Sequence, residues 1–71
     1  SSAQVGEAAL GETSGLLVRM RELAVQAANG TVGDDEKALI AEEATGLLAE
    51  AERVARGTRF AGTVLLAGAQ G

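Results

Sequence analysis

Apolar residues recur with a seven-residue period in two stretches of this sequence, and that period is what most restricts its fold. Between positions 40 and 54 the spacing alternates between four and three residues, which is the pattern of a coiled-coil seam. The positions are Ile40, Ala44, Leu47, Ala51 and Val54. Side chains at this spacing share one face of a helix, whereas a strand would alternate at every second residue. The pattern therefore predicts helices that pack side by side along their length.

The first of the two stretches predicts one long amphipathic helix over about residues 3–28. Its apolar positions lie on one face and are Ala9, Leu16, Met20, Leu23 and Ala27. Asn29-Gly30 follows at once, and both residue types accept the left-handed backbone conformation that closes many helices. A helix of ~26 residues is roughly 40 Å long at about 1.5 Å per residue. Such a helix is too long for a compact ball of 71 residues.

A polar loop over residues 29–34 is expected to lead into a second helix over about residues 35–56. Asp34 or Asp35 supplies the amino-terminal cap, and negative charge in the first turn is favoured by the helix dipole. Gly57 is expected to end this helix. Because the loop is short, the two helices are predicted to pack as antiparallel neighbours.

The residues after Gly57 are expected to leave the helical hairpin. Two runs that contain Thr, Val and Phe flank Ala61-Gly62, which predicts a short β-hairpin or extended segment over residues 58–66 and a frayed tail over residues 67–71. The predicted fold class is mainly α: a long antiparallel helical hairpin of coiled-coil type followed by a short β-hairpin or extended segment. Residues 1–71 form a single unit.

The composition limits both the stability and the partners of the chain. A chain of 71 residues buries little apolar surface and usually needs a further source of stability. Cys and His are absent, so neither a disulfide nor a structural zinc can supply it, and packing with a partner is the remaining source. A net charge of −4 repels phosphate backbones and anionic lipid. No apolar run approaches the roughly 20 residues of a membrane span. The sequence predicts neither nucleic acid nor membrane as a partner.

The sequence offers no set of residues suited to catalysis. Acid–base and nucleophilic chemistry draws mainly on His, Cys or carboxylates in a dry pocket, and the first two are absent. Glu36, Glu43 and Glu50 are seven residues apart and line one edge of the second helix. Such a stripe is usually solvated, and cation sites made of oxygen ligands need six or more that converge. We predict no enzyme activity, no metal site and no cofactor.

Arg19, Glu22 and Gln26 stand in a row along the end of the first helix. Residues three and four apart lie on the same helical face. The row is either the wet face that every amphipathic helix has or a surface that a partner recognises, and spacing alone favours the wet face.

The segment RMRELAVQAANGT at residues 19–31, followed by RVARGTRFAG at residues 53–62, closely resembles bacterial flagellin. The likeness covers nearly the whole chain, from Ala3 to Leu66, and corresponds to the amino-terminal part of the family's conserved inner core domain. It implies a piece of a longer chain, with a long helix, a loop, a second helix and a hairpin. Ala61 replaces the Asn of the family's Phe-Asn-Gly turn, which changes the expected geometry of the hairpin.

The resemblance implies a structural segment of the flagellar filament that lies outside the cell and acts by self-assembly. In flagellins these two helices pack with a helix from the carboxyl-terminal part of the same chain. The implied partners are therefore that helix and other flagellin subunits. Two alternatives are the hook–filament junction protein, which shares this domain, and a generic helical interaction module that matches by composition.

The resemblance also implies recognition by the Toll-like receptor that senses flagellin in innate immunity. The family's receptor-binding surface lies at the end of the first helix and the facing part of the second. The matching residues here, together with a neighbour in the same row, are Arg19, Glu22, Leu23, Gln26 and Glu43. Arg19 is expected to contribute most, because its long stem can fill a groove while its guanidinium pairs.

Overall fold

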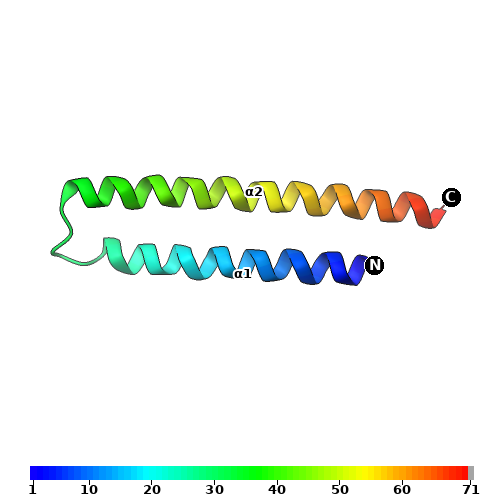
Figure 1. The fold of residues 1–71 in the computed structure, drawn as a ribbon, viewed down its shortest axis with the longest axis horizontal. Helices are drawn as coiled ribbons and strands as arrows, with labels where there is room; N and C mark the ends of the chain where they lie inside the picture. Colours follow the sequence, from blue (N-terminus) through cyan, green and yellow to red (C-terminus); the bar gives the residue numbers. More distant parts are fainter. Residues whose placement is uncertain (71) are drawn as a thin grey trace.

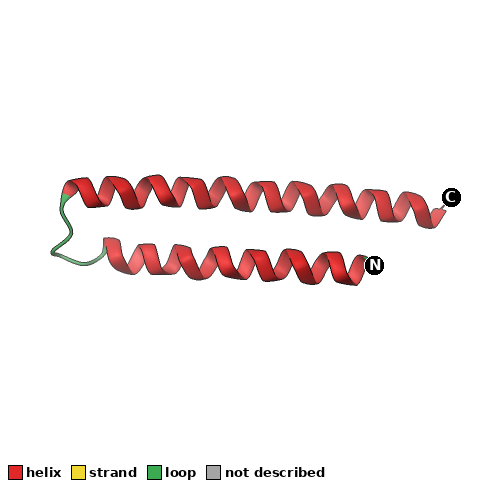
Figure 2. Cartoon of the chain, in the orientation of Figure 1, coloured by secondary structure: helices red, strands yellow, loops and turns green. Residues whose placement is uncertain are grey.

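The computed structural model describes residues 1–70 as two antiparallel helices joined by a short loop (Figure 1). Helix α1 spans Ser2–Ala27 and helix α2 spans Asp34–Gln70. The helices lie side by side in a rod whose principal extents are 59, 16 and 9 Å. Figure 2 shows that the described part of the chain contains helix and loop without a strand. The prediction of a long antiparallel helical hairpin is confirmed.

The expectation that Gly57 ends the second helix, and that residues 58–66 form a β-hairpin or extended segment, is wrong. Helix α2 continues through all of these residues to Gln70. The expectation of a frayed tail is therefore also wrong for residues 67–70, and Gly71 lies outside the described residues. The four-three spacing of the seam explains the result, because it continues past Val54 at Thr58, Ala61 and Leu65.

Local hydrogen bonds also accommodate the threonines at the end of α2 within the helix. The hydroxyl of Thr58 donates to the carbonyl of Val54 at 2.7 Å, and the hydroxyl of Thr63 donates to that of Arg59 at 2.9 Å. These bonds satisfy the Thr side chains within the helix, so they need no strand partner. A glycine inside a helix costs about 1 kcal/mol relative to Ala, which is too little for Gly57 alone to break this pattern.

The ends of the helices differ in detail from the sequence-based expectations. No residue has a positive φ in the part of the chain that the structure describes, so Asn29-Gly30 does not close α1 in the left-handed conformation. Instead the amide of Asn29 donates to the carbonyl of Gln26 at 3.2 Å. Helix α2 begins at Asp34, so the acidic residues lie in its first turn rather than at the cap position before it.

The core of the hairpin is thin. Among the residues whose burial the structure describes, only Leu23 and Ile40 are buried, with 3% and 9% of their surface exposed. The other predicted seam residues are half-buried, and they are Leu16, Met20, Leu47 and Val54. The prediction that this stripe is the intramolecular core is confirmed. Large apolar side chains elsewhere on both helices stay exposed, as two helices cannot cover their full circumference.

Neither of the helices in residues 1–70 combines the length and the apolar character that crossing a bilayer requires.

Candidate functional site

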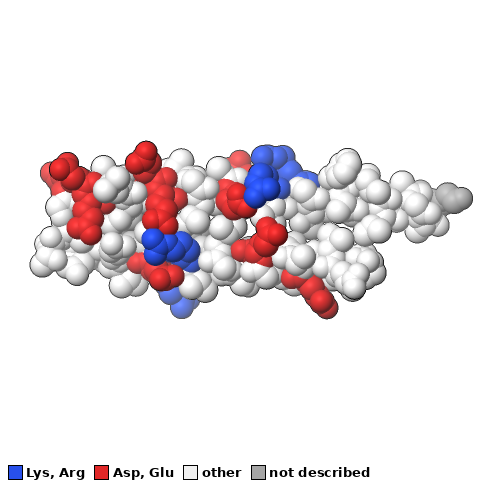
Figure 3. Space-filling view, in the orientation of Figure 1, with Lys and Arg blue, Asp and Glu red and all other residues white. Residues whose placement is uncertain are grey.

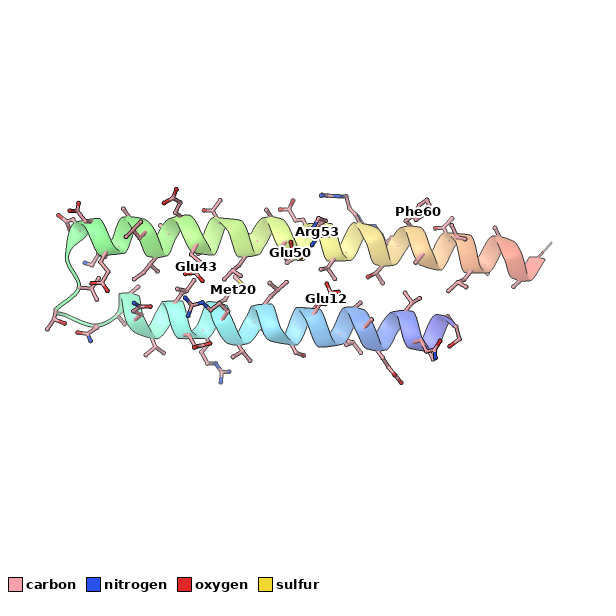
Figure 4. The ribbon with its side chains drawn as sticks, viewed as in Figure 1. Glu12, Met20, Glu43, Glu50, Arg53 and Phe60 are labelled. Atoms are coloured by element: carbon pink, nitrogen blue, oxygen red, sulfur yellow. The ribbon has the colours of Figure 1, made fainter. Side chains whose placement is uncertain are left out.

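Polar side chains from both helices meet along one face of the hairpin (Figure 3). On each helix they recur every seven residues, and because the helices are antiparallel each residue of α1 faces one of α2. We call this set the polar ladder; it consists of Glu12, Arg19 and Gln26 on α1 and Glu36, Glu43 and Glu50 on α2. Figure 4 shows Glu43 of α2 and Glu12 of α1 each pointing toward the opposite helix.

The central rung of the polar ladder is an ion pair between Arg19 and Glu43. The Nε of Arg19 donates to Oε2 of Glu43 at 2.6 Å, and Nη2 donates to Oε1 at 2.9 Å. This two-bond geometry is the strong, oriented form of an arginine–carboxylate pair. The hydrogen bond from Arg19 lowers the pKa of Glu43 below its ordinary value of 4.5, and the same bond raises the pKa of Arg19. Both side chains keep about two fifths of their surface exposed, at 43% and 42%.

The rung nearest the loop is weaker. The Nε2 of Gln26 donates to Oε1 of Glu36 at 3.5 Å, which is at the long limit of a hydrogen bond. Glu22 adds a second carboxylate near the central rung, because its Oε2 lies 3.9 Å from Nη1 of Arg19. Arg19 is therefore flanked by carboxylates from its own helix and from α2.

At the third rung, Glu12 of α1 and Glu50 of α2 line the same hollow as Arg53. Nε of Arg53 donates to Oε2 of Glu50 at 3.1 Å, and this hydrogen bond raises the pKa of Arg53, with smaller contributions from the charges of Glu50 and Glu12. Two open hollows, of about 290 and 420 Å³, flank Glu12 and Arg53 along the groove between the helices. The first is lined mostly by small or aliphatic residues, among them Ala8 and Gly57, whereas the second is lined mostly by charged ones. Both are too open to shield a reaction from water.

The structure brings four of the five predicted site residues to one exposed surface. Arg19, Glu22, Gln26 and Glu43 contribute side chains to it from both helices. Leu23 differs, because only 3% of its surface is exposed and it packs in the seam beneath them. In this hairpin Leu23 can hold the surface in place but cannot offer its side chain to a partner.

The sequence-based site did not include three members of the polar ladder, Glu12, Glu36 and Glu50, or Arg53, which pairs with Glu50. The signal was present, because Glu12, Arg19 and Gln26 have the same seven-residue period as the glutamates of α2. Taken separately, the row on α1 and the row on α2 each have the pattern of a solvated helix face. Only their pairing across an antiparallel hairpin joins them into one surface.

The chemistry available to the polar ladder is hydrogen bonding and charge pairing. Among residues 1–70, no group of three or more acidic side chains is arranged to hold a metal ion. The carboxylates of the polar ladder face water, so no dry environment tunes them for acid–base catalysis. The geometry suits recognition by another molecule.

Comparison with known proteins fits this architecture. The family model for the bacterial flagellin N-terminal helical region matches residues 1–71. The chain belongs to the bacterial flagellin family. Similar proteins include polar flagellin B/D of Vibrio parahaemolyticus and flagellin A of Vibrio anguillarum, each 45% identical over the whole chain. Flagellin D of Vibrio cholerae is 46% identical over 68 residues, which is 96% of the chain.

This flagellin-family chain spans 19% of the length of the first two of these relatives and 18% of the third. No solved structure gives a significant match to it.

Proposed function

We propose that this chain is a structural segment of a bacterial flagellar filament, located outside the cell, and that it acts by self-assembly without catalysis. Membership of the flagellin family over residues 1–71 supports the proposal. The structural observation that carries it is an extended hairpin with a thin core and one apolar face left uncovered. Such a hairpin is completed by packing against other helices.

The uncovered apolar face lies opposite the polar ladder. At about 100° per residue, Leu17 lies roughly 160° around α1 from Arg19, and Leu48 lies roughly 140° around α2 from Glu43. Leu17 is 61% exposed and Leu48 is 52% exposed. The proposed occupant of this face is a helix from the carboxyl-terminal part of the same flagellin. The polar ladder is then left to meet neighbouring molecules.

Helix complementation tests this assignment. The 71-residue chain alone is expected to be partly helical and to melt broadly, and addition of a carboxyl-terminal flagellin helix should raise its helicity and sharpen the melt. Leu17→Ser should weaken this effect. Val25→Ser is the control and should leave the effect intact, because Val25 is similarly exposed, at 69%, but lies about 240° around α1 from Arg19, counted in the same direction as the roughly 160° of Leu17. Circular dichroism follows both. Equal behaviour of the two variants would refute the proposed face.

Electron microscopy tests the requirement for further chain. The 71 residues by themselves are expected to form no filaments under conditions that grow flagellin filaments, because the hairpin lacks its partner helix. Ordered filaments of the chain alone would contradict the proposal.

A hook–filament junction protein remains the alternative within the flagellin family, because it shares this domain. The sequence on either side of these residues distinguishes the two. Family membership argues against a generic helical module that matches by composition alone.

A second proposed role is recognition by the Toll-like receptor that senses flagellin. The observation that favours it is the Arg19–Glu43 pair, which holds a long cationic side chain in one orientation on an exposed surface. An oriented Arg loses less conformational freedom when a partner binds, and Arg is enriched among residues that dominate interfaces. Glu22 and Gln26 extend this surface along α1. Leu23 supports it from the core.

Surface plasmon resonance with the receptor ectodomain tests this role on the chain complemented by its partner helix. Arg19→Ala should weaken binding by about thirtyfold or more if Arg19 dominates the interface. Arg56→Ala is the matched control, because Arg56 is also exposed and pairs with Glu52 at 3.8 Å, but lies outside the polar ladder. Equal affinities of the two variants would mean that the row on α1 is a solvated helix face and not a receptor-binding surface.

A further inference from the structure

Asn29 is the only asparagine of the chain, and it lies in the exposed loop directly before Gly30. We propose that Asn29-Gly30 is a site of spontaneous covalent modification, at which the asparagine converts through a succinimide to aspartate and isoaspartate. The inference is independent of the flagellar role, because it depends on the geometry of the loop and on water as the co-reactant.

The side chain of Asn29 is folded forward over the peptide that follows it. Its Oδ1 accepts a hydrogen bond from the amide of Thr31 at 3.0 Å and another from the hydroxyl of Thr31 at 2.8 Å. These bonds hold the carboxamide of Asn29 in one orientation beside the peptide that contains the backbone nitrogen of Gly30, the atom that must attack it. Within residues 1–70 that backbone nitrogen donates no hydrogen bond.

The two donors of Thr31 lie where charge develops during the reaction. When the nitrogen of Gly30 bonds to Cγ of Asn29, the electrons of the carbonyl move to Oδ1, which becomes negative. Donors already directed at that oxygen stabilise the intermediate. The nitrogen of Gly30 gives up its proton to water or hydroxide, and Nδ2 takes a proton from water. The bond from Cγ to Nδ2 then breaks, ammonia leaves, and a five-membered succinimide remains. One water adds to either carbonyl of the ring, so opening gives aspartate or isoaspartate without an oxidant or reductant.

Gly30 removes the steric obstacle to this attack. It has no Cβ to crowd the approach of its own nitrogen, and its φ is not positive, so the loop does not need glycine for its backbone conformation. A Cβ built at this position meets nothing within 4 Å. Gly30→Ala should therefore keep the fold while slowing the reaction, which makes it a suitable control.

The modification changes the end of α1. It adds a negative charge after the carboxyl end of the helix, where the dipole disfavours one, and close in sequence to Asp34 and Asp35. The isoaspartyl product also lengthens the backbone by one carbon in a tight turn. Both changes loosen the last turn of α1, which carries Gln26 of the polar ladder.

Mass spectrometry of the aged 71-residue chain tests the proposal. Trypsin releases residues 22–37 as one peptide that contains Asn29, and conversion adds about 1 Da to it. In mildly alkaline buffer the wild-type peptide should gain this mass, with two products separable by chromatography. Gly30→Ala should slow the gain by about tenfold or more, because its Cβ crowds the attacking nitrogen.

Thr31→Val tests the contribution of the loop geometry. This variant keeps the shape of the side chain but removes the hydroxyl donor. Under folding conditions it should convert at least about threefold more slowly than wild type, whereas in urea wild type and variant should convert at equal rates. Equal rates for wild type and Thr31→Val under folding conditions would overturn the role of the hydroxyl hydrogen bond, because the amide donor of Thr31 is present in both. Absence of any mass gain, while an unstructured peptide of the same sequence converts, would overturn the site itself.

Discussion

The two ends of the hairpin differ in how much of their apolar surface they bury. Near the loop, Leu23 and Ile40 are buried and the Arg19–Glu43 pair joins the helices across the groove. At the open end, Leu66 is 61% exposed, and Phe60, which is 72% exposed, points away from α1 (Figure 4), although both lie within regular helix. The difference shows that a residue can be helical without being buried, because burial requires both a seam position and a residue on the opposite helix.

The register explains why the open end is bare. Arg19 faces Glu43, and Ser2 shares an open hollow with Gly62 and Leu65. Residues beyond that point extend past the first turn of α1 as the structure describes it (Figure 1). The apolar residues of α2 beyond Leu65 therefore have no residue of α1 opposite them in this hairpin.

The largest expected effect in this comparison comes from truncating a residue at the closed end. Leu23→Ala should lower the stability of the hairpin by about 2 kcal/mol or more, because Leu23 is one of the two buried side chains in the described part of the chain, and few other core contacts can compensate for its loss. Phe60→Ala removes a larger side chain but should change stability by less than about 0.5 kcal/mol, because Phe60 is exposed. Helicity measured against urea concentration checks both. A larger loss from Phe60→Ala would reverse the comparison.

A smaller effect should come from replacing a glycine within α2. Gly57→Ala should stabilise the chain by up to about 1 kcal/mol, because alanine is the better helix former and a Cβ there meets nothing within 4 Å. Gly46→Ala is the matched control nearer the closed end, with equally open surroundings. Circular dichroism should show increased helicity in both. Destabilisation by Gly57→Ala alone would mean that Gly57 ends the helix after all.

The smallest expected effect concerns the charge pair at the closed end. Because the pKa of Glu43 is lowered in the folded hairpin, its contribution to stability is present above its ordinary pKa of 4.5 and is lost as the pH falls below that value. Glu43→Gln should therefore lower the melting temperature at neutral pH and have little effect at pH values well below 4.5. Both side chains of the pair are exposed, so the difference will be modest.

The control for this titration is Glu42→Gln, which removes a neighbouring carboxylate without a cross-helix ion pair in the described residues. Its effect should not show the same loss at low pH. A pH-independent effect of Glu43→Gln would contradict a stabilising role for the ion pair.

The sequence by itself determined the helical class, the antiparallel pairing and the residues of the seam. These follow from the seven-residue period and a short loop, because the spacing of apolar residues decides which face of a helix leaves water. The same period also contained the continuation of α2 at Thr58, Ala61 and Leu65. The glycines and β-prone residues around them suggested a hairpin, but such local preferences are weak beside a sustained helical pattern.

Tertiary structure alone decided how the polar rows combine and which site residues reach the surface. Arg19 and Glu43 are 24 residues apart, and only the register of the two helices brings them within 2.6 Å. The same register buries Leu23 beneath them while leaving Gln26 exposed. A sequence read along one helix gives the face on which a residue lies, but the opposite residue is set by the packing of two helices against each other.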